Sequence, residues 1–263
     1  MPKESDQFLR ALARGLSVIE SFEGGAPAYR LSEIAARSNM SRATTSRILN
    51  TLRRLGYVAT DGQRFSLKPK LLSLGHAYLS SFALPDVMLP YMKRLVGDEP
   101  HISSSSAVLD GTEIVFVAGV PAKGLLRVFM SVGMRVPAFA SAMGRMLLAS
   151  LPPERAAELL KMSKIQPLTK HTVVDPRKLA EIVAVARKRG FAVADQELGL
   201  GMRSLAVPIL DRHGEAIAAI SATHHGMDMS IRTFIKRYLS RMQQTAAEIS
   251  QSVSNLQLIR DQV

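Results

Sequence analysis

The 263-residue sequence contains no cysteine. This absence excludes disulfides, thiolate nucleophiles and cysteine-ligated metal or iron–sulfur sites, and it fits a reducing compartment. Long hydrophobic runs are missing too: no stretch approaches the roughly 20 apolar residues that a transmembrane helix needs. The first residues, MPKESDQF, lack the apolar core of a signal peptide. We therefore expect a cytoplasmic protein with no membrane partner.

Acidic residues are absent from one particular stretch. Between Glu33 and Asp61 there is no aspartate or glutamate, although five arginines fall there. Solvated helices usually mix both signs, so this imbalance indicates a polyanionic partner. The net charge of +12 is also uneven, because residues 1–82 carry 12 Lys/Arg against 6 Asp/Glu and the rest carry 22 against 16. The N-terminal part is thus the more basic for its length.

A helix, helix, turn, helix, hairpin order is predicted for this basic part. Apolar residues recur at a helical period over residues 8–22, and a short second helix is expected around 31–35. Ser41 is a suitable N-cap for a third helix that runs to about residue 55, where Gly56 ends it. The predicted hairpin strands are residues 57–60 and 64–67, on either side of Asp61-Gly62.

The third helix is one-sided. Its apolar face is formed by Thr45, Ile48, Leu49, Leu52 and Leu55. Arginine can bind guanine in a bidentate way, asparagine can bind adenine, serine can adapt, and a small alanine can meet a thymine methyl. A merely solvated basic helix is the alternative, but the neighbouring turn and hairpin favour DNA. The predicted DNA-binding residues are Arg42, Ala43, Thr44, Ser46, Arg47, Asn50, Arg53, Arg54 and Arg64.

The remaining chain is predicted to be an antiparallel α+β domain. A helix over residues 71–79 and the breaker-rich segment SSFALPD separate it from the basic part. We therefore predict two domains, residues 1–82 and residues 83–263. Another helix is expected over about 87–96, with Pro90 near its first turn. Alternating strands and helices then indicate the α+β class. The predicted strands are 102–109, 113–118, 126–130, 204–210 and 216–223, and the helices are 142–150, 153–162 and 176–189.

A long helix is expected from Ile231 to the end of the chain. Its apolar residues alternate spacings of four and three, which suits a coiled-coil seam and equally a helix lying across a sheet. We favour the sheet. The apolar positions are Ile235, Leu239, Met242, Ala246, Ile249, Val253 and Leu256.

Six segments in this order resemble the IclR-type bacterial transcription regulators. They are ARGLSVIESF, LSEIAARSNMSRATTSRILNTLRRLGYV, PKLLSLG, VLDGTEIVFVAGV, VGMRVPAFASAMGRMLLASLP and RGFAVADQELGLGMRSLAVPILDRHGEAIAAISAT. The resemblance implies an N-terminal winged helix-turn-helix, a linker helix and a C-terminal GAF-like effector domain. It also implies homodimers, often paired into tetramers, that bind double-stranded operator DNA, with RNA polymerase as a candidate further partner and no cofactor.

Within that family, the segments are most similar to regulators of aromatic-acid breakdown, in the protocatechuate, 4-hydroxybenzoate and β-ketoadipate pathways. A small organic acid is therefore the implied effector. The sequence departs from the family pattern at Arg145, where many relatives carry lysine, and at Ser204, where some carry cysteine.

An effector site can be expected where ASAMGRMLLA begins a helix. Unpaired N–H groups and the helix dipole favour an anion at such a helix start. Ser221 and Thr223 lie two apart on one strand and share a face. The resemblance adds the remaining positions. The predicted effector-binding residues are Ala142, Met143, Asp195, Ser204, Ser221 and Thr223.

Further side chains are candidates for the same pocket. Ser103 and Ser105 share a strand face that either lines the pocket or forms a solvated edge. Apolar walls are expected from the Phe- and Met-rich segments nearby. These candidates are Phe129, Met130, Met134, Phe139, Met143 and Met202.

A metal site and two other functions are less well supported by the sequence. His224-His225 invites a metal, but adjacent strand residues point to opposite faces and no further ligand stands at a suitable spacing. A metabolic enzyme with a DNA-binding appendage is the main alternative. The sequence contains neither a nucleotide-binding motif nor an activated nucleophile, so we predict no catalytic residue. A chromosome-architectural protein, which would bind with little sequence preference, is a third class.

Overall fold

The computed structural model describes residues 8–23, 26–76, 84–123 and 131–260. The chain divides into two compact units, Met1–Phe82 and Ala83–Val263. The predicted strand at 126–130 and the end of the predicted linker helix, after residue 76, lie outside the described residues. No helix in the described ranges has both the length and the hydropathy needed to cross a membrane.

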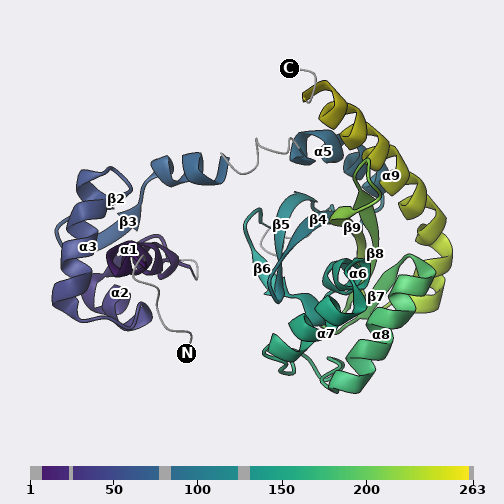
Figure 1. The fold of residues 1–263 in the computed structure, drawn as a ribbon, viewed down its shortest axis with the longest axis horizontal. Coiled ribbons are helices and arrows are strands. Elements are labelled where there is room, and N and C mark those ends of the chain that lie inside the picture. The colour runs from purple at the N-terminus through teal and green to yellow at the C-terminus, as the bar shows by residue number, and fades with distance from the viewer. Residues whose placement is uncertain (1–7, 24–25, 77–83, 124–130, 261–263) are drawn as a thin grey trace. The chain divides into compact units, whose positions relative to one another are not determined.

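The N-terminal unit is a helical bundle backed by a small sheet (Figure 1). Its three-stranded antiparallel sheet has the order β1-β3-β2. The core is closed by Val18, Ile34 and Leu49, which are fully buried. The elements are α1 (Arg10–Glu20), β1 (Tyr29–Arg30), α2 (Leu31–Arg37), α3 (Arg42–Arg54), β2 (Val58–Thr60) and β3 (Arg64–Leu67). This is the predicted helix-turn-helix followed by a hairpin.

Local capping signals set the ends of α3. The Ser41 hydroxyl accepts a hydrogen bond from the Thr44 amide at 3.2 Å, as expected for an N-cap. Gly56 adopts a φ of 82° after the helix, where a left-handed residue lets the chain leave the axis. Asn39 has a φ of 50° and makes the turn between α2 and α3. Residues directly before and after α3 thus determine where this helix begins and ends.

The hairpin of β2 and β3 is stabilised by Asp61, which lies in its turn. Asp61 Oδ1 accepts hydrogen bonds from the amides of Gln63 at 2.8 Å and Arg64 at 2.7 Å. These bonds lower the pKa of the Asp61 carboxyl. The strand β1 was not predicted, because two residues are too few to show a period. It pairs Tyr29 with Phe65 on β3.

The C-terminal unit is a six-stranded antiparallel sheet with helices on both faces. The strand order is β6-β5-β4-β9-β8-β7. Helices α5 and α9 cover one face and α6, α7 and α8 cover the other (Figure 1). The strands are β4 (Ile102–Asp110), β5 (Glu113–Val120), β6 (Arg135–Pro137), β7 (Ala192–Asp195), β8 (Met202–Leu210) and β9 (Ala216–His225). The helices are α5 (Leu84–Val96), α6 (Ala142–Ser150), α7 (Pro153–Met162), α8 (Pro176–Arg189) and α9 (Ile231–Arg260).

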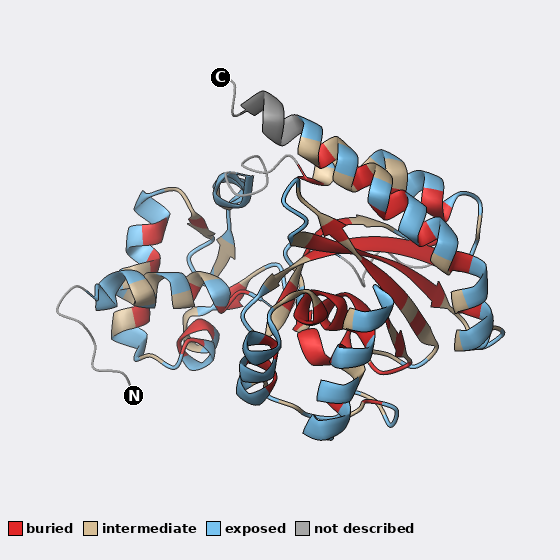
Figure 2. Ribbon diagram, turned by 45° about the vertical axis from the view of Figure 1, so that its right-hand side comes forward, coloured by how far each residue is buried: buried red, intermediate tan, exposed pale blue. Residues whose placement is uncertain are grey.

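Burial is concentrated in the layer between the sheet and α6. Eight of the nine residues of α6 are buried, so this helix is enclosed on nearly all sides (Figure 2). A helix that is buried all round belongs to the core. The start of α6 is therefore held firmly in position.

Three expectations for this unit need correction. Helix α5 begins at Leu84, so Pro90 lies inside the helix and not in its first turn. Strands β6 and β7 were missed, since three and four residues give too little alternation. In α9 the first buried residues are Phe234 and Tyr238 instead of Ile235 and Leu239.

The last helix lies across the sheet, as we favoured. Helix α9 contacts β8 and β9 and packs beside α5. The predicted positions Met242, Ala246, Ile249 and Val253 are buried.

Candidate functional site

The polar face of α3 is open to solvent. Thr45, Leu49 and Leu52 face the core of the unit. Thr44 and Ser46 are half-buried at the border of the two faces. The exposed residues among the nine DNA-binding candidates are Arg42, Ala43, Arg47, Asn50, Arg53, Arg54 and Arg64. The structure thus brings these candidates to the surface, and whether they touch DNA stays a prediction.

Arginines on this face differ from Arg37, which belongs to the same acid-free stretch. The Arg37 guanidinium donates to the carbonyls of Ser21 at 2.6 Å and Glu23, and stacks over the Tyr29 ring at 4.8 Å. Arg37 therefore holds the fold together. By contrast, no acidic side chain in the described part of the chain pairs with the guanidiniums of α3, which remain available for phosphates and bases.

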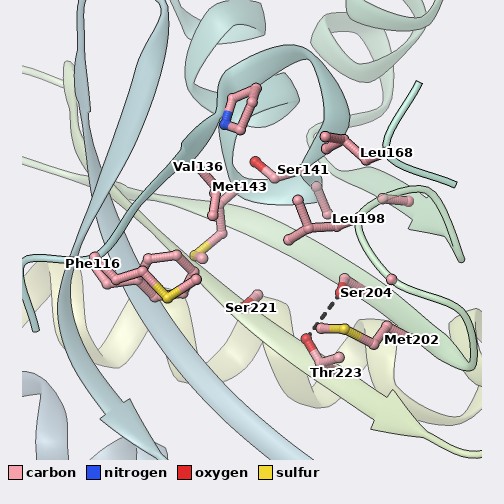
Figure 3. A pocket seen from close by; sticks show the side chains of 15 residues that line it. Phe116, Val136, Ser141, Met143, Leu168, Leu198, Met202, Ser204, Ser221 and Thr223 are labelled. Atoms are coloured by element: carbon pink, nitrogen blue, oxygen red, sulfur yellow. Dashed lines mark hydrogen bonds between the residues drawn. The ribbon is translucent and has the colours of Figure 1, made fainter. Parts of the chain in front are cut away.

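A cavity of about 300 Å³ lies in the C-terminal unit between the start of α6 and the sheet (Figure 3). It brings together residues from five stretches of the chain, around positions 116, 134–143, 168, 194–204 and 221–223. The lining residues are Phe116, Met134, Val136, Pro137, Ser141, Ala142, Met143, Leu168, Ala194, Leu198, Gly199, Met202, Ser204, Ser221 and Thr223. The walls are mainly apolar, with hydroxyls at two places, as is common in small-molecule sites.

The N-terminus of α6 forms one end of the cavity. The Ser141 hydroxyl accepts from the Gly144 amide at 2.9 Å and so caps one of the free N–H groups. Within the described residues, the amides of Ala142 and Met143 have no hydrogen-bond acceptor. Two donors at the positive end of a buried helix can hold a carboxylate.

A glycine makes this helix start possible. A Cβ built on Gly144 would lie 2.3 Å from the Cα and the carbonyl oxygen of Ala138. The short 3₁₀ turn Ala138–Ala140 could not approach α6 so closely beside any other residue.

The floor of the cavity carries three hydroxyls from neighbouring strands. Thr223 and Ser221 project from β9 on the same face, and Ser204 stands opposite Thr223 on β8. The Ser204 and Thr223 hydroxyls are 2.9 Å apart (Figure 3). The Ser221 hydroxyl donates to the Ser105 carbonyl oxygen at 3.4 Å. The five predicted effector positions Ala142, Met143, Ser204, Ser221 and Thr223 thus line one cavity.

The sixth predicted position, Asp195, lies elsewhere. It pairs with Arg203, and its neighbour Ala194 pairs with Ser204, so Asp195 points to the sheet face away from the cavity. There its Oδ1 forms an ion pair with Arg203 Nε at 3.1 Å. Ala194, and not the predicted Asp195, therefore lines the cavity.

Other predictions for the pocket are divided. Met134, Met143 and Met202 line the cavity, Phe139 is buried in the core outside it, and Phe129 and Met130 lie outside the described residues. Sequence reasoning missed Phe116, Leu168 and Leu198.

Ser103 and Ser105 line neither the cavity nor an edge. They are fully buried on β4, a central strand, because β5 and β9 flank it on both sides. Ser103 Oγ lies 2.8 Å from His225 Nε2.

The histidine pair separates as a strand requires. His224 is buried on the α9 side, where its Nε2 lies 2.9 Å from Asp228 Oδ1. His225 points to the other face, towards Ser103. Burial and the nearby rings of His224 and His101 lower the pKa of His225. Among the described residues, no group of three or more His, Asp or Glu side chains could hold a metal ion.

Comparison with protein families matches both units. The family model described as "IclR helix-turn-helix domain" covers residues 11–62. The model described as "Bacterial transcriptional regulator IclR C-terminal" covers residues 76–251.

Individual relatives extend this similarity. The Pca regulon regulatory protein of Pseudomonas putida is 39% identical over 219 residues, which cover 83% of this chain and 75% of the relative. The p-hydroxybenzoate hydroxylase transcriptional activator of Acinetobacter baylyi is 30% identical over 250 residues, covering 93% and 92%. An IclR homologue from Microbacterium hydrocarbonoxydans, solved in complex with 4-hydroxybenzoate, has a TM-score of 0.79 at 26% identity and covers 94% of this chain and 99% of that one.

Proposed function

Because this chain belongs to the IclR family of bacterial transcription regulators, we propose that it regulates genes of aromatic-acid breakdown in response to a small organic acid. DNA is bound by the exposed face of α3, and the acid is bound in the cavity under α6. The names of the relatives support the pathway: one regulates the Pca regulon and another activates p-hydroxybenzoate hydroxylase transcription.

One observation carries the effector assignment. Ala142 and Met143, whose amides lie at the start of α6, line the same mainly apolar cavity as Ser221 and Thr223. A carboxylate at the helix end, a ring against the walls and a polar group at the floor would match this arrangement. The homologue solved with 4-hydroxybenzoate supports the same class of ligand. The bound acid acts on transcription by favouring one arrangement of the regulator over another.

Calorimetric titration of the full chain tests the effector assignment. We expect binding of at least one of 4-hydroxybenzoate, protocatechuate and β-ketoadipate, and a weaker signal from benzamide, which has no carboxylate. If none of the three acids binds, the effector assignment fails.

The DNA-reading unit is proposed to work as a homodimer on a palindromic site. A single module of this size buries little DNA surface, and paired half-sites roughly one helical turn apart, or a multiple of it, increase affinity. Exposed leucines at the N-cap of α1 and along it support a protein interface, since Leu9, Leu12 and Leu16 are 70%, 60% and 49% exposed. Light scattering should give twice the mass of one chain, or a higher multiple, and affinity should fall steeply with salt.

The alternative, an enzyme with a DNA-binding appendage, makes a different prediction. A turnover assay with the same acids would show product formation. We expect the acids to be recovered unchanged, because the cavity presents hydroxyls and backbone amides without an activated nucleophile among its described lining residues.

A further inference from the structure

We propose that the buried ion pair between Arg145 and Glu197 positions the effector site by joining three segments that line the cavity. This inference rests on the proposed effector binding. It assigns to the pair a positioning function without direct contact, since neither residue lines the cavity.

Arg145 connects the start of α6 to the sheet. It lies in the first turns of α6, and its side chain is only 2% exposed. Its Nε donates to the Phe139 carbonyl at 2.8 Å and one terminal nitrogen donates to the Val193 carbonyl at 3.1 Å. Both remaining bonds go to Glu197, at 2.5 and 2.6 Å. The helix start is thereby fixed to β7.

Glu197 connects the start of α6 to two loops, one containing Leu168 and the other containing Leu198. Its Oε2 accepts from the Val173 amide at 2.9 Å, and its carbonyl accepts from the Thr172 hydroxyl at 2.7 Å. The Thr172 hydroxyl in turn accepts from the Leu168 amide at 3.0 Å. Leu168 lines the cavity, and so does Leu198, which follows Glu197 directly. The pair therefore holds the helix start, the Leu168 loop and the Leu198 loop together.

The charge of Arg145 is not left for the effector. A bidentate carboxylate neutralises it, and the guanidinium lies behind the helix start instead of in the cavity. A buried ion pair is also weak evidence for added stability, because matched apolar residues are often as stable. The value of this pair lies in its geometry: planar, fork-shaped groups fix relative positions better than apolar side chains do.

The test replaces both charges and compares effector binding with folding. In the double variant Arg145→Met with Glu197→Met, no charge stays buried without a partner. The carbonyls of Phe139 and Val193 and the amide of Val173 lose their partners, so we expect a lower thermal midpoint in a protein that still folds. DNA affinity should stay near wild type while affinity for 4-hydroxybenzoate falls at least tenfold. In the wild type, adding the acid should change the NMR chemical shift of the ¹⁵N-labelled Met143 amide. In the double variant this change should be absent. A matched control is Glu113→Gln, which weakens the exposed pair with Arg135 and should change none of these values.

If the double variant does not fold, a single variant tests the inference instead. Glu197→Gln keeps the shape of the side chain, and hydrogen exchange of residues 168–173 and 196–201 is measured without ligand. We expect faster exchange in both loops together. Wild-type exchange in Glu197→Gln, or a folded double variant that binds 4-hydroxybenzoate within twofold of wild type, overturns the inference. If the wild type binds no acid, the proposed function fails, whereas the exchange experiment still decides whether the pair holds the loops.

Discussion

Ser204 and Thr223 face each other across β8 and β9 with their hydroxyl oxygens 2.9 Å apart, on the floor of the cavity. Each hydroxyl can donate once and accept twice, so this mutual bond leaves capacity for a ligand. The floor is therefore preorganised, because a polar group of the effector meets two hydroxyl oxygens that already lie side by side.

Removing floor hydroxyls should weaken effector binding without unfolding the protein. In Ser221→Ala with Thr223→Val, shapes are nearly kept but two hydrogen-bonding groups are lost. We expect a loss of about 1–3 kcal/mol in binding free energy, measured by calorimetry with 4-hydroxybenzoate. The control Thr233→Val changes an exposed threonine at the start of α9 and should bind as wild type does. Equal affinity in the double variant would remove this hydroxyl pair from the site.

Gly144→Ala should destabilise the C-terminal unit. The added methyl would lie 2.3 Å from the backbone of Ala138, so the 3₁₀ turn or α6 must move. Overpacking of this kind typically costs about 1–3 kcal/mol, which thermal unfolding will show as a lower midpoint. Gly15→Ala is the matched control, because nothing lies within 4 Å of a Cβ there, and it should be neutral or stabilising. A Gly144→Ala protein as stable as wild type would contradict the observed packing.

Elements with local signals could be predicted from the sequence. Helix α8 has an aspartate N-cap, Asp175, whose Oδ1 accepts from the Arg177 amide at 2.8 Å, and a C-terminal Gly190 with a φ of 72°. The start of α6 at Ser141 is equally local. Because these ends depend on one or two neighbouring residues, α6 and α8 have the predicted bounds.

Features that depend on register or on distant contacts could not be predicted. Whether Ala194 or Asp195 faces the cavity is decided by one residue in a four-residue strand without alternation. Leu168 belongs to an irregular loop that carries no period. The Arg145–Glu197 pair joins positions 52 residues apart, and only the folded chain brings them together.

Acidic pH should destabilise the protein partly through His225. Burial and the neighbouring His224 and His101 lower its pKa below the ordinary value of 6.5, so the folded state prefers the neutral ring. Between the folded-state pKa and pH 6.5, the unfolded chain binds more protons than the folded chain. The free energy of unfolding therefore rises with pH in this range. The contribution is complete above about pH 6.5 and is lost as the pH falls through the lower, folded-state pKa.

Urea unfolding followed by circular dichroism between pH 5 and pH 8 measures this effect. We expect His225→Gln to flatten the pH dependence of the unfolding free energy, while His171→Gln, at an exposed histidine, leaves it unchanged. An equally steep pH dependence in His225→Gln would assign the effect to other groups.

Arg47→Ala should weaken operator binding and relax its sequence preference. Arg47 lies on the exposed face of α3, close to Asn50, and an arginine that binds guanine contributes about 1–3 kcal/mol of discrimination. The measurement uses DNA selected by the wild-type protein from a random pool, with single base-pair changes across the site. Arg54→Ala should differ from Arg47→Ala, because we expect Arg54 to bind phosphate. Its loss should lower affinity equally for all DNA sequences and reduce the slope of log affinity against log salt concentration by about one. Arg155→Ala, at an exposed arginine of α7, is the control and should bind as wild type does. If Arg47→Ala keeps full operator affinity while circular dichroism shows the helices intact, α3 does not read the bases through this residue.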